Sequence, residues 1–98
     1  MPVVMQMKWN GVTPDQYDQV REKVNWVEEA TGGGMFHVAW FQDDALRVID
    51  VWDSAEAFQA FTNDRLMPGV QAIGIEGAPE IDIQPTHSVL DQLHKERW

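Results

Sequence analysis

The sequence predicts an α+β domain in which a four-stranded antiparallel sheet carries two helices on one face. Four segments alternate apolar and polar residues with a period of two, as strands do, and two segments repeat apolar residues every three or four positions, as amphipathic helices do. The segments follow the order strand, helix, strand, strand, helix, strand, which is the ferredoxin-like βαββαβ arrangement.

The first strand is predicted from Val3 to Trp9, and a helix follows it. Thr13 and Gln16 can form a capping box at the start of this helix, and Pro14 suits its first turn. We expect the helix to end by Ala30, because a run of three glycines follows and glycine is a poor helix former. Its buried stripe is expected to contain Tyr17, Val20, Val24 and Val27.

The next two strands are predicted from Met35 to Gln42 and from Ala45 to Trp52, with Asp43-Asp44 as the turn of a hairpin. Closure by a two- or four-residue loop places His37 opposite Asp50 on the neighbouring strand. The hairpin therefore predicts a histidine–carboxylate pair on one face of the sheet.

The second helix begins after Asp53 or Ser54, either of which can cap it. Pro68 is predicted to open a separate short turn of helix that Gly74 ends, and the last strand runs from Glu80 to Gln84. The apolar stripe of the second helix is expected to contain Ala55, Phe58, Phe61 and Leu66.

Composition restricts the possible functions. The 98 residues suit a single domain, residues 1–98, with residues 86–98 as a C-terminal tail or arm. A net charge of −9 argues against nucleic-acid and anionic membrane partners. The absence of cysteine excludes disulfides and thiolate sites. With no signal peptide and no apolar stretch of about 18 residues, we expect a cytoplasmic protein that does not bind membranes.

The apolar face of the sheet that the helices leave open needs a cover. In every strand, the alternate residues that point away from the helices are apolar enough to need burial. The chain offers no third layer to cover them. A second copy of the chain is the expected cover, so we predict a homodimer.

Several short segments carry a resemblance to a known group of proteins. They are Phe36-His37-Val38-Ala39, Arg47-Val48-Ile49-Asp50-Val51-Trp52-Asp53-Ser54, Glu56-Ala57-Phe58, Phe61, Arg65-Leu66-Met67-Pro68, Gly74-Ile75 and Thr86-His87. Together they resemble the dimeric α+β barrel proteins grouped around the antibiotic-biosynthesis monooxygenases, above all their actinobacterial members. The resemblance extends from about Val3 to His87.

This resemblance implies a homodimer with its sheets packed back to back and a ligand pocket between sheet and helices in each subunit. Cofactor-independent oxygenases of the group hold an electron-rich aromatic substrate with Trp, Asn, Arg or Tyr side chains, and the substrate itself activates oxygen. The same superfamily contains haem degraders, isomerases and proteins of unknown role, so the resemblance leaves the reaction open.

His37 and Asp50 are the candidate catalytic residues. Directly opposite residues of an antiparallel pair have Cβ atoms about 4.5–5.5 Å apart, and a carboxylate at that distance can fix the imidazole tautomer and make it a general base. The alternative is a pair that only satisfies a half-buried position of the sheet.

The candidate substrate-binding residues are Trp52, Asn25, Trp26, Phe58 and His87. Trp52 shares the parity of Asp50 and is expected on the same face, although an ordinary core or interface tryptophan is the alternative. Trp26 lies off the apolar stripe of the first helix, so packing within that helix does not explain it. Arg47 is expected opposite Trp40, in a stacking or intersubunit role, and Arg65 is expected to be a surface charge. No paired metal-ligand spacing is visible, so we expect no metal and no cofactor.

Two functions follow as hypotheses. The first is a cofactor-independent monooxygenase, or a related isomerase or cyclase, that acts on a small aromatic or polyketide-like compound. The second is a non-catalytic ligand-binding or stress-associated dimer.

Overall fold

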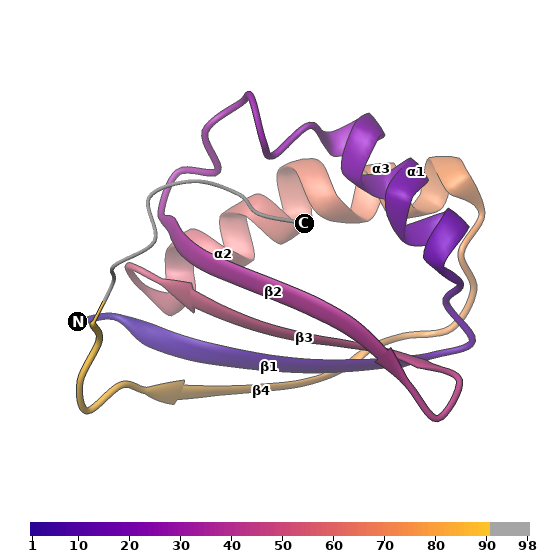
Figure 1. The fold of residues 1–98 in the computed structure, drawn as a ribbon. Coiled ribbons are helices and arrows are strands. Elements are labelled where there is room, and N and C mark those ends of the chain that lie inside the picture. The colour runs from indigo at the N-terminus through magenta and orange to yellow at the C-terminus, as the bar shows by residue number, and fades with distance from the viewer. Residues whose placement is uncertain (91–98) are drawn as a thin grey trace.

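The computed structural model describes residues 1–90, which form an antiparallel sheet with a layer of helices on one of its faces (Figure 1). The strands are β1 (Val3–Asn10), β2 (Gly34–Gln42), β3 (Ala45–Trp52) and β4 (Glu80–Pro85), in the spatial order β2-β3-β1-β4. The helices are α1 (Pro14–Val24), α2 (Ala55–Phe61) and α3 (Met67–Ile73), with the π-helical turn η1 (Thr62–Leu66) between the last two. The predicted ferredoxin-like α+β fold class is confirmed. None of the helices within residues 1–90 is long and apolar enough to cross a membrane.

The start of α1 follows the predicted capping box. The Thr13 hydroxyl oxygen accepts a hydrogen bond from the Gln16 backbone N–H at 3.2 Å. The Gln16 side-chain oxygen accepts one from the Thr13 backbone N–H at 3.0 Å. Two backbone donors that would otherwise lack partners are thereby satisfied.

The end of α1 comes well before Ala30. Asn25 adopts a left-handed conformation, with φ 59°, and its N–H donates to the Arg21 carbonyl, which ends the helix at Val24. Asparagine reaches this conformation more easily than most residues, so it can replace glycine as a helix terminator. The prediction that Val27 belongs to the buried stripe is wrong, because Val27 lies beyond the helix and is 49% exposed.

The helical run after Ser54 is continuous, whereas a separate turn at Pro68 was predicted. Ser54 is the cap, and its hydroxyl accepts from the Ala57 N–H at 3.1 Å. Pro68 occupies the first turn of α3, directly after η1. Proline cannot donate the usual helical hydrogen bond, and the wider π-helical turn before it lets the chain continue without that bond. Gly74 ends the run in a left-handed conformation, as predicted.

Arg65 projects from η1 toward the end of α1 and the segment that follows. Its guanidinium donates to the carbonyl oxygens of Ala30 at 2.6 Å, Val24 at 3.0 Å and Glu29 at 3.3 Å. It also lies over the Phe61 ring, 5.2 Å from the ring centroid. The expectation of a surface charge is wrong, because the Arg65 side chain is only 25% exposed and satisfies one carbonyl at the end of α1 and two in the segment that follows.

The two faces of the sheet differ in how they are covered. The face under the helices carries Met5, Met7, Trp9, Val48 and Trp52, which are buried against Tyr17, Val20, Val24, Phe58, Phe61 and Val70 of the helices. The other face, called the outer face here, carries Phe36, Val38 and Trp40 of β2, which are 38–40% exposed. No helix within residues 1–90 covers the outer face (Figure 1).

The predicted tail is described only in part. Residues 86–90 form no helix, and Thr86 donates to the Pro2 carbonyl from both its N–H and its hydroxyl, at 3.1 and 3.0 Å. The remainder of the predicted arm, residues 91–98, lies outside the described residues.

Removing the cap of α1 tests the capping box. We expect Thr13→Ala to lower the free energy of unfolding by about 1 kcal/mol, because the Gln16 N–H loses its acceptor. Urea denaturation of both proteins measures the difference. An unchanged midpoint would contradict the capping role of Thr13.

Removing the guanidinium tests how Arg65 holds the chain after α1. We expect Arg65→Gln to lower the free energy of unfolding by about 2 kcal/mol, since a charged donor to several carbonyls is lost. Lys23→Gln is the matched control, because Lys23 is an exposed cation in the last turn of α1 and its loss should cost only a few tenths of a kcal/mol. Equal losses in the two variants would show that Arg65 contributes only charge.

Candidate functional site

The hairpin between β2 and β3 sets the register of the candidate site. Asp43 and Asp44 form its two-residue turn, with φ 53° and 58°, the left-handed values that a tight hairpin turn requires at both positions. This turn pairs His37 with Asp50 and Trp40 with Arg47, as predicted.

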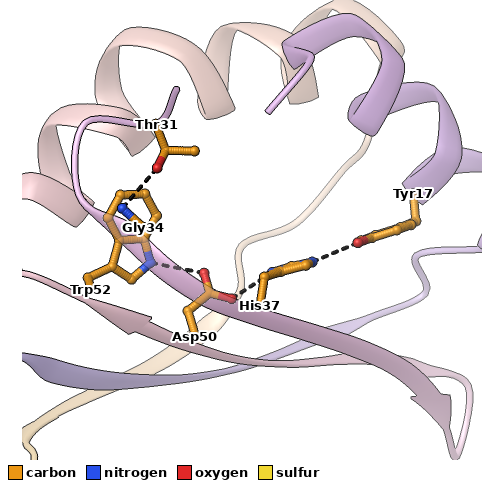
Figure 2. A network of polar contacts seen from close by, with 6 residues as sticks. All are labelled: Tyr17, Thr31, Gly34, His37, Asp50 and Trp52. Atoms are coloured by element: carbon orange, nitrogen blue, oxygen red, sulfur yellow. Dashed lines mark hydrogen bonds and ion pairs between the residues drawn. The ribbon is translucent and has the colours of Figure 1, made fainter. Parts of the chain in front are cut away.

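The paired side chains of His37 and Asp50 are hydrogen-bonded. His37 Nδ1 lies 2.6 Å from Asp50 Oδ1, and the indole N–H of Trp52 donates to Asp50 Oδ2 at 3.0 Å (Figure 2). Asp50 is the one buried charged residue within residues 1–90, at 7% exposure. Its two oxygens each have a partner, so the structure compensates for removing the carboxylate from water.

Tyr17 extends this chain of contacts to the helix layer. Its hydroxyl lies 2.7 Å from His37 Nε2 (Figure 2). A carboxylate can only accept, so Nδ1 of His37 carries the proton, Nε2 accepts, and the Tyr17 O–H donates to it. The polar chain therefore runs from Tyr17 through His37 to Asp50, with Trp52 on the far oxygen; we call these four side chains the relay.

Tyr17 was expected only as a member of the apolar stripe of the first helix. It is buried at 8% exposure, as the stripe predicted, but its hydroxyl serves the relay. Its residue type was a usable signal, because a buried tyrosine hydroxyl needs a hydrogen-bond partner.

Trp26 lies beside the relay, in the segment that joins α1 to β2. Its ring centroid is 5.6 Å from that of His37 and 5.8 Å from that of Tyr17. Its indole N–H is buried and has no acceptor among the described residues. Asn25, the residue before it, is the terminator of α1. The structure thus brings Trp26 to His37. Trp26 lies off the apolar stripe of α1 because it follows the helix and is not part of it.

The glycine run in the same segment allows a close approach to α2. A Cβ atom on Gly33, which has φ 150°, would lie 2.8 Å from the Ala57 Cβ. The Gly33 carbonyl accepts from the Asp53 N–H at 2.8 Å, and the Gly34 N–H donates to the Thr31 hydroxyl at 2.8 Å (Figure 2). These bonds and the contacts of Arg65 hold the segment that carries Trp26.

Trp52, a member of the relay, packs against Phe58 within the core. They are 3% and 4% exposed, with ring centroids 5.5 Å apart in an edge-to-face arrangement. Trp52 shares the face of His37, as predicted, but it reaches the site through its bond to Asp50. Burial leaves Phe58 without a free surface for a ligand.

His87 is not brought to His37. It lines an open groove of about 600 Å³ at the outer face, together with Val4, Phe36 and Val51. Side chains of successive strand residues point to opposite faces, so a groove at Phe36 and Val51 lies across the sheet from His37 and Asp50. Within residues 1–90, no three His, Asp or Glu side chains gather closely enough to hold a metal ion.

Known structures share this fold. No protein-family model and no curated protein matches the sequence. A protein of unknown function from Nitrosomonas europaea has a TM-score of 0.69 at 14% identity, over 95% of this chain and 96% of that one. SnoaB, a cofactor-independent oxygenase from Streptomyces nogalater, has a TM-score of 0.64 at 15% identity, over 93% and 97% of the two chains.

A third similar structure contains a ligand. The monooxygenase ActVA-Orf6 of Streptomyces coelicolor, in complex with nanaomycin D, has a TM-score of 0.58 at 17% identity, over 92% of each chain. At such low identity these likenesses establish the fold of the chain. That fold is the one seen in SnoaB, in ActVA-Orf6 and in a putative antibiotic biosynthesis monooxygenase from Caulobacter crescentus.

Proposed function

We propose that this protein is a homodimeric, cofactor-independent monooxygenase acting on a small aromatic or polyketide-like compound. The observation that carries the proposal is the 2.6 Å contact between His37 and Asp50, because an imidazole held by a carboxylate is a common general base. The fold supports the same choice, since SnoaB is a cofactor-independent oxygenase and ActVA-Orf6 is a monooxygenase that binds nanaomycin D.

Oxygenation without a cofactor requires a substrate that can itself reduce oxygen. A base first removes a proton from an acidic C–H group beside an aromatic ketone. The carbanion passes one electron to O₂ and combines with the resulting superoxide, forming a C–O bond. The peroxide anion takes back the proton from the base, and the hydroperoxide then loses water together with the second hydrogen of the same carbon, so one oxygen atom stays in the product as a ketone and the other leaves as water. A related isomerase or cyclase would share only the first step.

The residues of the site divide this work. The relay accepts the proton, and Asp50 stabilises the imidazolium that forms. We assign substrate contact to Trp26, because its indole N–H has no acceptor within the described residues and could be satisfied by a ligand oxygen, and to Asn25 only as its neighbour in the chain. Trp52, supported by Phe58, orients the carboxylate.

A non-catalytic ligand-binding dimer is the second candidate. The observation that favours it is that both ring nitrogens of His37 have partners within the protein, as in purely structural polar networks. The two candidates differ in turnover, since a binding protein would hold an aromatic ligand without consuming oxygen.

The homodimer is proposed from the outer face. Phe36, Val38 and Trp40 of β2 are exposed there, and Arg47 beside them has a buried Nε without an acceptor among the described residues. A second sheet packed against this face would bury the apolar side chains and offer acceptors to Arg47.

The oxygenase proposal is tested with anthrone as a probe substrate. We expect the wild-type protein to accelerate oxygen consumption and anthraquinone formation, and His37→Gln to reduce the rate by about a hundredfold, because the general base is lost. An oxygen electrode and product absorbance measure both rates.

Carboxylate removal gives the matched comparison for this test. Asp50→Asn should reduce the rate strongly, while Asp18→Asn, the same change at an exposed position of α1, should not. If His37→Gln oxidised anthrone at the wild-type rate, His37 would not be the general base. Binding of anthrone without oxygen consumption by the wild type would favour the ligand-binding candidate.

Sedimentation tests the dimer. We expect about twice the chain mass of 11.2 kDa at micromolar concentration, retained at high salt because apolar burial holds the interface. Val38→Asp should yield monomers, whereas Val27→Asp, a change at an exposed valine away from the outer face, should not. A folded wild-type monomer would contradict the proposal.

A further inference from the structure

We propose that the Tyr17 phenolic oxygen is the atom through which the His37–Asp50 pair exchanges protons with a ligand. The inference rests on the proposed acid–base function and names a further catalytic residue for it.

The first argument is that His37 has no free ring nitrogen. Nδ1 is engaged by Asp50 at 2.6 Å and Nε2 by the Tyr17 hydroxyl at 2.7 Å. A general base must come within hydrogen-bond distance of the proton that it removes. With both nitrogens occupied, the imidazole can act on a ligand only through one of its two partners, and the Tyr17 hydroxyl is the partner that can both give and take a proton.

The second argument is the direction of the hydrogen bonds. Asp50 accepts from Nδ1, so Nε2 presents a lone pair to the Tyr17 O–H. As the phenolic oxygen takes a proton from a ligand, or attacks an electrophile, its own proton passes to Nε2. Asp50 stabilises the imidazolium, and Trp52 holds Asp50 from the other side. Hydroxyl, imidazole and carboxylate thus have the roles that they have in nucleophilic triads, with a phenol in place of serine.

The third argument is the surroundings of the phenol. Tyr17 makes edge-to-face contacts with Trp26 and Phe41, at centroid distances of 5.8 and 6.4 Å. Phe41 is 39% exposed and the His37 side chain 34% exposed, so the aromatic cluster reaches the surface although Tyr17 itself is buried. Aromatic side chains beside the phenol offer stacking partners to a flat aromatic ligand that carries an acidic proton.

The test uses phenylmethanesulfonyl fluoride, because Tyr17 is the single tyrosine of the chain. In the labelling step the Tyr17 oxygen forms a bond to sulfur, the S–F bond breaks, fluoride leaves, and the phenolic proton passes to His37 Nε2. Mass spectrometry of the tryptic peptide 9–21 measures the rate of sulfonylation.

We expect labelling of Tyr17 in the wild type and a rate about a hundredfold lower in His37→Gln. Asp50→Asn should also be slow, and Trp52→Phe, which keeps the aromatic ring but loses the donor to Asp50, should be intermediate. Asp18→Asn should label at the wild-type rate. No labelling of the wild type, or equal rates in the wild type and a folded His37→Gln, would overturn the inference.

The two proposals fail separately, since sulfonylation needs neither oxygen nor a natural substrate. Labelling that depends on His37 in a protein that does not oxidise anthrone would keep the role of Tyr17 and remove the oxygenase. Oxidation of anthrone by Tyr17→Phe at the wild-type rate would keep the oxygenase and overturn the role of Tyr17. Circular dichroism of each variant separates loss of the relay from loss of the fold. If Asp50→Asn does not fold, the labelling rate of His37→Gln decides whether Tyr17 has this role, because the His37 side chain is 34% exposed and its replacement should leave the fold intact.

Discussion

The buried carboxylate of Asp50 is the constraint around which the polar side of this fold is arranged. A charge removed from water must be paired and hydrogen-bonded, or it costs several kcal/mol. β3 places Asp50 on the covered face of the sheet, between Val48 and Trp52 in the alternating pattern. Trp52 and His37 supply one partner for each oxygen, and His37 then requires a partner of its own, which Tyr17 provides.

These hydrogen bonds join the helix layer to the sheet by polar contacts, in addition to the apolar packing between them. Tyr17 belongs to α1, while His37 and Asp50 belong to neighbouring strands. The position of α1 therefore affects the orientation of the imidazole. The 2.7 Å contact between the phenol and Nε2 requires α1 to stay at this distance from the sheet.

Arg65 has a corresponding role for the segment after α1. The π-helical turn η1 directs its guanidinium to the carbonyl of Val24, the last residue of α1, and to two carbonyls of that segment, and the glycine run lets the same segment approach α2 closely. Trp26 lies between these two attachments. Its position beside the relay is thus set by residues far apart in the sequence, and its buried indole N–H has no acceptor within residues 1–90, which costs free energy.

The sequence by itself determined the order of the strands and the two helical regions, the starts of α1 and α2, and the hairpin register. These features depend on local chemistry, namely the Thr13 box, the Ser54 cap and the Asp43-Asp44 turn. The turn alone predicted the contact between His37 and Asp50. Tertiary structure decided the rest, because it depends on contacts between residues distant in the chain. Residue spacing does not predict three of these contacts and placements. They are the hydrogen bond from Tyr17 to His37, the hydrogen bond from Arg65 to Val24, and the position of His87 across the sheet. A periodic pattern specifies which face a side chain occupies, but the partner that it meets there is specified only when the layers pack.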